Sequence, residues 1–561
     1  MTRNGSIWML TATLACWGFA APARAQQISE ARIHELITQA ADRVAHGQLD
    51  AGQQPAAAPG AARPKVSLTL DDAVKFALDR NLDIAVQRLN PEINDIAYAG
   101  IRSAYHPLLT SLLNKQSTTT PSTSTLSGGQ SGGDAIVAGL GTANVGIAQS
   151  VPWGGGSFNV ALNNNQTTTT SLNTLYNPTY NTNWSGVYTQ PLLRGFRTDS
   201  TRRSLQVTKL SRDISDVQLR ATITNTLSNV RNAYWDYVFA VQSVDVAKQS
   251  VALATQLVKD NQTRVEVGTM APIDVVQAQS QAAAQQQLLV AAQGAMRTAE
   301  LALKRLIVAG AQDPNWNVEL DPTDRPEFRV ETVDVEAAVR RALAERTDLA
   351  IAKKSIDTND VTLKYLQDQL RPQADAQVTY GLVGLGGTQL ITGPGNGVNR
   401  IVTGTIPGGF GDALSTLFGH NYPRWNFTLN FSYPLGLSQQ EANVARARVQ
   451  LNQVQAQTRQ IELQVATDVA NAAINVQSGV ERVQAAQAAR ELAQKTLEAE
   501  QSKFEVGMST NYNVILTQRD LATAQTNELQ AILNYRKALV ELERVQQTTL
   551  TSLGITILAP Q

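Results

Sequence analysis

The segment Val265–Gln279, VEVGTMAPIDVVQAQ, returns later in the chain as Phe504–Gln518, FEVGMSTNYNVILTQ. Both segments contain Glu-Val-Gly, followed at the same spacing by a valine and a glutamine. A second echo lies upstream of each segment, where Ala73, Val74, Ala77, Leu78, Asp83 and Pro107 match Ala338, Val339, Ala342, Leu343, Asp348 and Pro372 at one constant offset. Two echoes in the same order indicate a duplicated chain, with one structural repeat over 67–330 and a second over 331–561.

Residues 1–25 are typical of a secretory signal peptide, with Arg3 before an apolar stretch and the small-residue site Ala23-Arg24-Ala25 at the end. Cys16 is the only cysteine and would leave with the signal, so the mature chain would have neither disulfides nor thiolate metal sites. The alternative is lipidation of Cys16, because Thr13–Cys16 loosely resembles a lipoprotein cleavage box. Residues 26–66 form an N-terminal extension and linker.

The chain has 47 basic and 47 acidic side chains, so it lacks the basic excess of a nucleic-acid-binding protein. After the signal, no apolar run reaches the length of about eighteen residues that a membrane-spanning helix needs. If the exported chain enters a membrane, a closed β-barrel is therefore the structure that would satisfy its backbone hydrogen bonds.

Strands are expected at about 108–191 in the first repeat and at about 373–434 in the second. The clearest alternation lies in 425–433, with polar residues between apolar Trp425, Phe427, Leu429, Phe431 and Tyr433. In the first repeat, 143–151 and 157–163 alternate and are joined by a turn at Pro152–Gly156. The stretches 117–142, 163–182 and 383–423 are expected to be loops. Before the strands, single helices are expected, one capped by Thr69 or Asp71 and running to about Tyr105, the other capped by Asp334 and ending before Pro372.

Long helices follow the strands of each repeat, over 198–308 and 438–548. Apolar residues recur along them with a mean step close to 3.5 residues, which is the coiled-coil value. Gly268 and Gly507 interrupt this pattern and predict a helical hairpin at each position. About sixty residues of helix before each glycine would span roughly 90 Å.

No catalytic, cofactor-binding or metal-binding motif is found, so the chain is not expected to be an enzyme or to hold a cofactor. The sequence has no phosphate-binding loop of the GxxxxGK type, no HExxH and no GxSxG elbow. The four histidines share no metal-ligand spacing: His34, His46, His106 and His420.

The order of these elements resembles the TolC-type outer-membrane efflux protein family, also called outer membrane factors. The resemblance covers about 68–550 and is carried by Gln190-Pro191-Leu192-Leu193, by Tyr433-Pro434-Leu435 and by the two Glu-Val-Gly hairpins. It implies an α+β membrane protein with a duplicated strand-pair/long-helix repeat. Three identical chains would each give four strands to one twelve-stranded β-barrel in the bacterial outer membrane. A periplasmic α-helical coiled-coil barrel would continue it.

The resemblance also implies a function and partners. The homotrimer would be the passive exit duct of a tripartite efflux or type I secretion system, coupled to an inner-membrane pump through a periplasmic adaptor (membrane fusion) protein. Its other partner would be outer-membrane lipid, with no nucleic acid. The alternative is a non-conducting trimeric coiled-coil spacer or a surface structural protein. The pump would choose the cargo.

Site residues follow from the matched motifs. The adaptor would dock at the hairpins of Val267, Gly268, Val506 and Gly507. The candidates for the pore mouth are Asp274, Asn513 and Phe504. Asp274 has two interpretations: three copies form an acidic ring, or the carboxylate only favours the N-terminus of its own helix.

In the sheet, six aromatic residues are expected to face lipid or its interfaces, opposite a polar face toward a wet lumen: Trp184, Tyr188, Trp425, Phe427, Phe431 and Tyr433. The alternative is a soluble β-sandwich whose core is this aromatic face. The Pro152–Gly156 hairpin either adds strands to the barrel or packs elsewhere.

Overall fold

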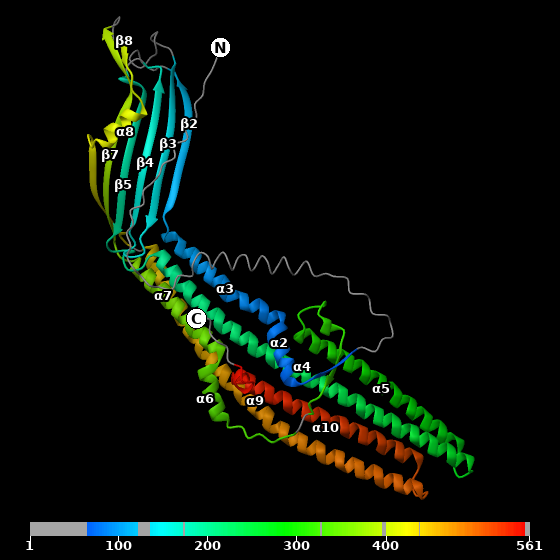
Figure 1. Cartoon of the computed structure of the whole chain (residues 1–561). Coiled ribbons are helices and arrows are strands. Elements are labelled where there is room, and N and C mark those ends of the chain that lie inside the picture. The colour runs from blue at the N-terminus through cyan, green and yellow to red at the C-terminus, as the bar shows by residue number, and fades with distance from the viewer. Residues whose placement is uncertain are drawn as a thin grey trace, which may run out of the picture. The chain divides into compact units, whose positions relative to one another are not determined.

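The computed structural model describes residues 64–121, 135–171, 174–325, 328–394, 400–436 and 438–555. In these ranges the chain forms an antiparallel sheet, two pairs of long helices and several shorter elements (Figure 1). The predicted signal peptide, Cys16 and nearly all of the predicted extension lie outside the described residues.

The first half of the chain begins with a short strand and two helices, continues with four strands and a long helical hairpin, and ends with a second short strand. Its elements are β1 (Lys65–Leu68), α2 (Leu70–Arg80), α3 (Leu82–Arg102), η1 (Ser103–Tyr105), β2 (Leu108–Thr120), β3 (Ile136–Ser150), β4 (Ser157–Thr169), β5 (Tyr176–Pro191), α4 (Ser200–Glu266), α5 (Pro272–Ile307), η2 (Pro314–Trp316) and β6 (Glu319–Pro322).

The second half repeats this order with fewer strands. Its elements are α6 (Val335–Glu345), α7 (Thr347–Asp368), β7 (Gln373–Pro394), β8 (Arg400–Ile406), α8 (Phe410–Phe418), β9 (Pro423–Ser432), α9 (Gln439–Glu505), α10 (Asn511–Val545) and α11 (Thr549–Ser552).

The sheet has seven strands in the order β2-β3-β4-β5-β7-β8, and β9 pairs with β7 as well. The 22-residue strand β7 has room for both partners on one side. Its first part, Gln373–Leu382, pairs with β9, and its last part, Gln389–Pro394, pairs with β8. At the level of β9 the sheet is therefore six strands wide, which differs from the four strands that the resemblance implied.

Several predictions of loops are wrong, because pairing between distant segments extends the strands. The Thr-rich stretches continue as strand to Thr120 and to Thr169, since a neighbouring strand takes up their backbone groups and threonine fits a pleated sheet. The stretch expected as a loop at 383–423 contains the rest of β7, then β8 and α8. Helix α8 packs on β7, where Gly384 and Gly386 leave room for Ala413 and Leu417.

The two helices expected before the strands are each broken once. Asn81 is the C-cap of α2 and the N-cap of α3, and its side chain accepts from the backbone N–H groups of Asp83 and Ile84. In the second half, Arg346 separates α6 from α7 at the same place in the repeat. The backbone at both residues is extended, so neither helix runs through.

Helices α4 and α9 each have 67 residues, a length of about 100 Å. Asp199 caps the start of α4, and Ser438 forms a capping box with Glu441 at the start of α9. The helices pack in the order α3, α4, α7, α9 beside the sheet, and in the order α5, α4, α10, α9 farther from it (Figure 1).

A parallel ribbon of β1 and β6 was not expected from the sequence. Tyr234 and Tyr237 of α4 are buried and hold it in place, because their hydroxyls donate to the carbonyl oxygens of Leu68 and Leu320 respectively. Burial raises the pKa of both tyrosines, so they remain donors at any ordinary pH. The ribbon closes one apolar core around α4, and a second core surrounds α9 and α10.

Candidate functional site

The two helical hairpins turn at glycines in the left-handed backbone region. Gly268 has φ of +80° and Gly507 has φ of +78°. In each turn the chain folds back onto the helix that ends there: the N–H of Thr269 donates to Arg264 O at 2.9 Å, and the N–H of Met508 donates to Lys503 O at 2.8 Å. This is the usual helix end with glycine in the left-handed conformation.

The outer surface of both turns is apolar and exposed. Val267 is 73% exposed, Val506 is 70% exposed and Met508 is 79% exposed. Ile273 and Tyr512, at the starts of the returning helices, are also exposed. Exposed apolar side chains gathered at a helical tip suit a docking surface for a second protein.

Phe504 does not lie on this exposed surface. It is 7% exposed and packs with Leu257, Leu497 and Val514 in a small core between the two hairpins. The Arg264 guanidinium lies 4.3 Å from the centre of its ring, and Nη1 donates to Phe504 O at 3.0 Å. Phe504 therefore joins the first hairpin to the second.

Asp274 lies in the first turn of α5 and is half-buried. Its backbone carbonyl accepts from Nδ2 of Asn511 at 3.2 Å, and the Asn511 Oδ1 accepts from Asn261 at 2.8 Å. These bonds fix Asp274 against the start of α10. Within the described part of the chain its carboxylate forms no ion pair. Asn513, at the matching position of the second repeat, is exposed and donates to Ser509 Oγ at 3.4 Å.

The register of the sheet brings the predicted aromatic residues of the strands to one face. Trp425 pairs with Tyr380, which pairs in turn with Gly186, and directly paired residues share a face. Because side chains alternate along a strand, that face carries Trp184 and Tyr188 of β5 together with Phe427 and Phe431 of β9. Trp425 is 80% exposed. Tyr433 comes one residue after the end of β9 and is exposed as well.

The opposite face of the same strands is polar. Asn426, Thr428 and Asn430 of β9 lie there, and β5 contributes Asn183 and Ser185. One aromatic face and one amide- and hydroxyl-rich face are the pattern expected of a barrel wall between lipid and water.

The sequence did not point to the ion pairs that join the two repeats. Three of them connect α4 to the second half: Arg231 Nη1 to Glu543 at 2.6 Å, Lys537 to Asp236 at 2.6 Å, and Lys354 to Asp213 at 3.2 Å. Their partners lie far apart in sequence, so no local pattern could have revealed them.

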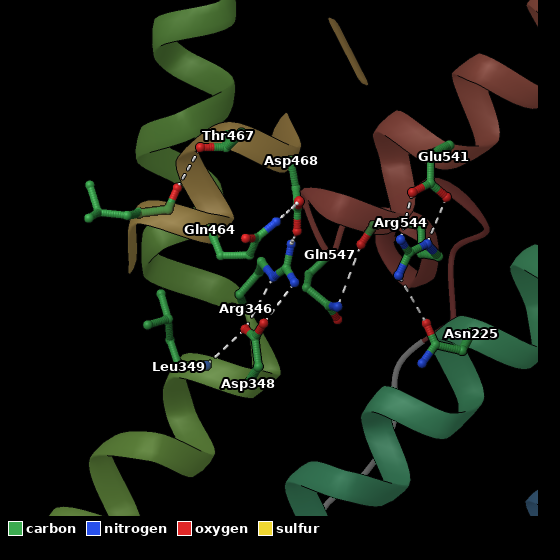
Figure 2. A network of polar contacts seen from close by, with 11 residues as sticks. Asn225, Arg346, Asp348, Leu349, Gln464, Thr467, Asp468, Glu541, Arg544 and Gln547 are labelled. Carbon is green, nitrogen blue, oxygen red and sulfur yellow. Dashed lines mark hydrogen bonds and ion pairs between the residues drawn. The ribbon is translucent and has the colours of Figure 1, made fainter. Parts of the chain in front are cut away.

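Figure 2 shows the polar network around the break between α6 and α7. Arg346 binds Asp348 at 2.7 Å and Asp468 of α9 at 3.3 Å. In the same view, Arg544 of α10 reaches Asn225 of α4 at 3.4 Å. Arg346 thus secures the start of α7 on α9.

No helix in the described ranges combines the length and the apolar character needed to cross a bilayer. Within those ranges, no group of three His, Cys, Asp or Glu side chains could bind a metal ion.

A two-faced sheet continued by helices of this length defines a class of protein: a channel whose wall passes from strands into a helical tube. The model of the outer membrane efflux protein family matches residues 74–308 and 338–546, once in each repeat. The chain belongs to the outer membrane efflux protein family.

Solved structures show the same fold at low sequence identity. The chain is similar to the CmeC channel of Campylobacter jejuni (TM-score 0.59, 13% identity, covering 85% of both chains). It is also similar to VceC of Vibrio cholerae (0.58, 13%, covering 85% of this chain and 95% of that one) and to MtrE of Neisseria gonorrhoeae (0.57, 15%, covering 85% and 88%). No match is found among curated protein sequences.

The chain thus has the fold of the trimeric outer-membrane channels, a β-barrel continued by a helical coiled-coil barrel. It is located in the bacterial outer membrane and extends into the periplasm. Its family consists of efflux channels, not of enzymes.

Proposed function

We propose that three copies of this chain form a passive exit duct, which receives cargo from an inner-membrane pump through a periplasmic adaptor protein. The observation that carries this proposal is the two-faced sheet. Trp425, Phe427 and Phe431 would meet outer-membrane lipid, and Asn426, Thr428 and Asn430 would line the water-filled lumen. Selection inside such a duct depends on pore width and charge rings, and no bond is made or broken.

The adaptor would bind the exposed hairpin tips. Val267 and Val506 present apolar surface there, and the turns around Gly268 and Gly507 hold a fixed shape. The tips lie about 100 Å of helix away from the sheet, so they would be the part of the duct that a periplasmic partner meets first.

Asp274 is proposed to form a three-fold acidic ring at the periplasmic mouth. The backbone hydrogen bond from Asn511 holds it at the tip, and its carboxylate is free of ion pairs within the described residues. Asn513 and Phe504 would have supporting roles, since Asn513 carries no charge and Phe504 is buried between the hairpins.

Single-channel recording on the purified protein in planar bilayers tests the duct. We expect the protein to give discrete conductance steps with a preference for cations, and Asp274→Asn should weaken that preference. Asp245→Asn is a matched control, because it removes an exposed acid of α4 away from the tip. Membrane-inserted trimers that never conduct would contradict the duct and support a spacer. An unchanged selectivity in Asp274→Asn would contradict the ring.

A further inference from the structure

Each chain contributes more strands to the sheet than the resemblance implied. Six strands lie side by side at the level of β9: β2, β3, β4, β5, β7 and β9. The additional pair is the β3–β4 hairpin, which the sequence left either in the barrel or outside it. In the structure β3 pairs with β2 and β4 pairs with β5, so the hairpin stands between the two strands that flank it in sequence.

The added strands have the same two faces as the rest of the sheet. Through the register, Ile147 of β3 and Val160 of β4 share a face with Gly186 of β5, which is the face of Trp184 and Tyr188. Asn144 and Asn163 pair with each other on the opposite, polar face. A hairpin that packed elsewhere would have no reason to keep this alternation in step with its neighbours.

The turn of the hairpin is fastened at the helical end of the sheet. Gln190 Nε2 donates to Gly154 O at 2.7 Å, and Gln149 Nε2 donates to Tyr105 O at 3.0 Å. Gly154 and Gly155 both have φ of +69°, which a tight turn requires. The hairpin is therefore a built part of the wall.

The sheet has two free edges. Within the described residues, β2 pairs only with β3, and β9 pairs only with β7. Every residue of β2 is exposed, and nearly every residue of β9 is exposed. Unpaired backbone groups cost several kcal/mol each in lipid, so each edge needs a strand from another chain.

The helices end at the same two edges. In the order α3, α4, α7, α9, the outer helices are α3, which leads to β2, and α9, which follows β9. The free side of α3 has five exposed apolar residues at alternating steps of four and three: Leu82, Val86, Leu89, Ile93 and Ile96. On α9, Val449, Leu463 and Ile474 are exposed between 57% and 71%. Steps of four and three are the pattern of a helix that packs against another helix.

We propose that three copies join edge to edge, β9 and α9 of one copy against β2 and α3 of the next, into an eighteen-stranded barrel. This rests on the trimer of the proposed function. The directions agree, because β2 leaves the helices and β9 returns to them, so the joined strands are antiparallel. If the helical ends are flush, Leu108 lies opposite Ser432 and Leu112 opposite Thr428. Since barrel width grows about linearly with strand number, the lumen is about one and a half times as wide as in a twelve-stranded barrel.

Disulfide formation between introduced cysteines tests this arrangement in outer membranes that contain the full chain. Thr428→Cys is combined in turn with Thr110→Cys, Leu112→Cys and Asn114→Cys, which share the polar face. At least one combination should give covalent dimers and trimers on a denaturing gel without reductant. Thr428→Cys with Leu113→Cys is the matched control on the opposite face, and each single-cysteine parent shows the background.

Two further double-cysteine variants test how many strands lie between β2 and β5. Thr110→Cys with Ser185→Cys spans β2 to β5, about 14 Å apart across two intervening strands, so no disulfide is expected. Asn144→Cys with Asn163→Cys should link β3 to β4. A disulfide between β2 and β5 would overturn the eighteen-stranded wall, and no link between Thr428→Cys and any same-face partner would overturn the edge pairing. Links as expected in a trimer that does not conduct would leave this inference standing and contradict only the duct.

Discussion

At the scale of single residues, the second hairpin turn depends on a glycine at position 507, because the backbone there is in the left-handed region. A Cβ at Gly507 or Gly268 would meet no heavy atom within 4 Å, so a larger residue is opposed by its backbone conformation and not by a clash. The left-handed conformation costs a residue with a Cβ about 1–2 kcal/mol, and asparagine tolerates this conformation better than most other residues.

We expect Gly507→Val to reduce export several-fold, because the tip would lose its fixed shape, while trimers remain in the outer membrane. Gly507→Asn is the matched variant and should keep most of the export. Export rate and adaptor co-purification measure both effects. Equal and normal export in the two variants would contradict a role of the turn in docking.

We expect Glu500 to make the second turn sensitive to acid. Its carboxylate accepts from Ser509 Oγ, and this bond, followed by Lys503, lowers the pKa of Glu500 below its ordinary value of 4.5. The charged Glu500 carboxylate thus stabilises the turn fully above pH 4.5. This stabilisation is lost as the pH falls through the lower pKa that Glu500 has in the folded protein.

A spin label on Met508→Cys should therefore become more mobile when the pH is lowered below about 4.5. Ser509→Ala removes the hydroxyl that donates to Glu500. In this variant the spin label at position 508 should be more mobile at neutral pH, and its mobility should rise less when the pH is lowered. A label whose mobility changes equally with pH in both proteins would show that another group controls the turn.

At the scale of elements, side-chain caps fix the starts of α3 and α6. Asn81 is 4% exposed; it caps α3 and also donates to Leu306 O at 2.9 Å, which ties the break to the end of α5. Asp334 caps α6 in an exposed position, with bonds of 3.0 Å and 3.2 Å to two backbone N–H groups.

Asn81→Ala should lower the free energy of unfolding by about 1–3 kcal/mol, because buried backbone groups lose their partner. Asp334→Ala should cost only about 1 kcal/mol, since water replaces an exposed cap. Thermal unfolding followed by far-UV circular dichroism compares the two. A larger loss in Asp334→Ala would show that burial does not decide the cost.

The long helices and their hairpins could be predicted because their signals are local. A seam near 3.5 residues, a glycine at each tip and a proline shortly after Gly268 lie within a few turns of one another. The helix from Thr69 was predicted without its break at Asn81, because an asparagine there is also compatible with a continuous helix. Its hydrogen bond to Leu306 becomes visible only in the folded chain.

The site was partly predictable for the same reason. Alternation identified Trp425, Phe427 and Phe431 as one side of a strand, and the register adds Trp184 and Tyr188 to that side. That this face meets lipid stays a prediction. Phe504 matched a pore-mouth position by sequence, but only the packing of four helices places it in a core beneath Arg264.

At the scale of the whole molecule, the width of the wall can be tested by removing the additional hairpin. Deletion of residues 136–169 would leave β2 and β5 to pair directly, with their polar faces still in step. The barrel would then have twelve strands and about two-thirds of the width. We expect a lower size limit for neutral polymers that enter from the extracellular side.

The polymers must be added on that side, because the periplasmic mouth lies at the other end of the duct and does not limit their entry. Trimers of the deleted protein on a native gel serve as the control for assembly. An unchanged size limit in assembled trimers would show that the hairpin does not widen the barrel.

The sequence by itself determined the duplication, the two long helical hairpins and the alternation of the strands, because each depends on the spacing of neighbouring residues. Only the tertiary structure decided the six-strand width, the place of α8 on β7 and the parallel ribbon that pairs Lys65 with Glu319. These features join segments that are distant in the chain. Their energy comes from backbone pairing and burial across the fold, which no local pattern of residues encodes.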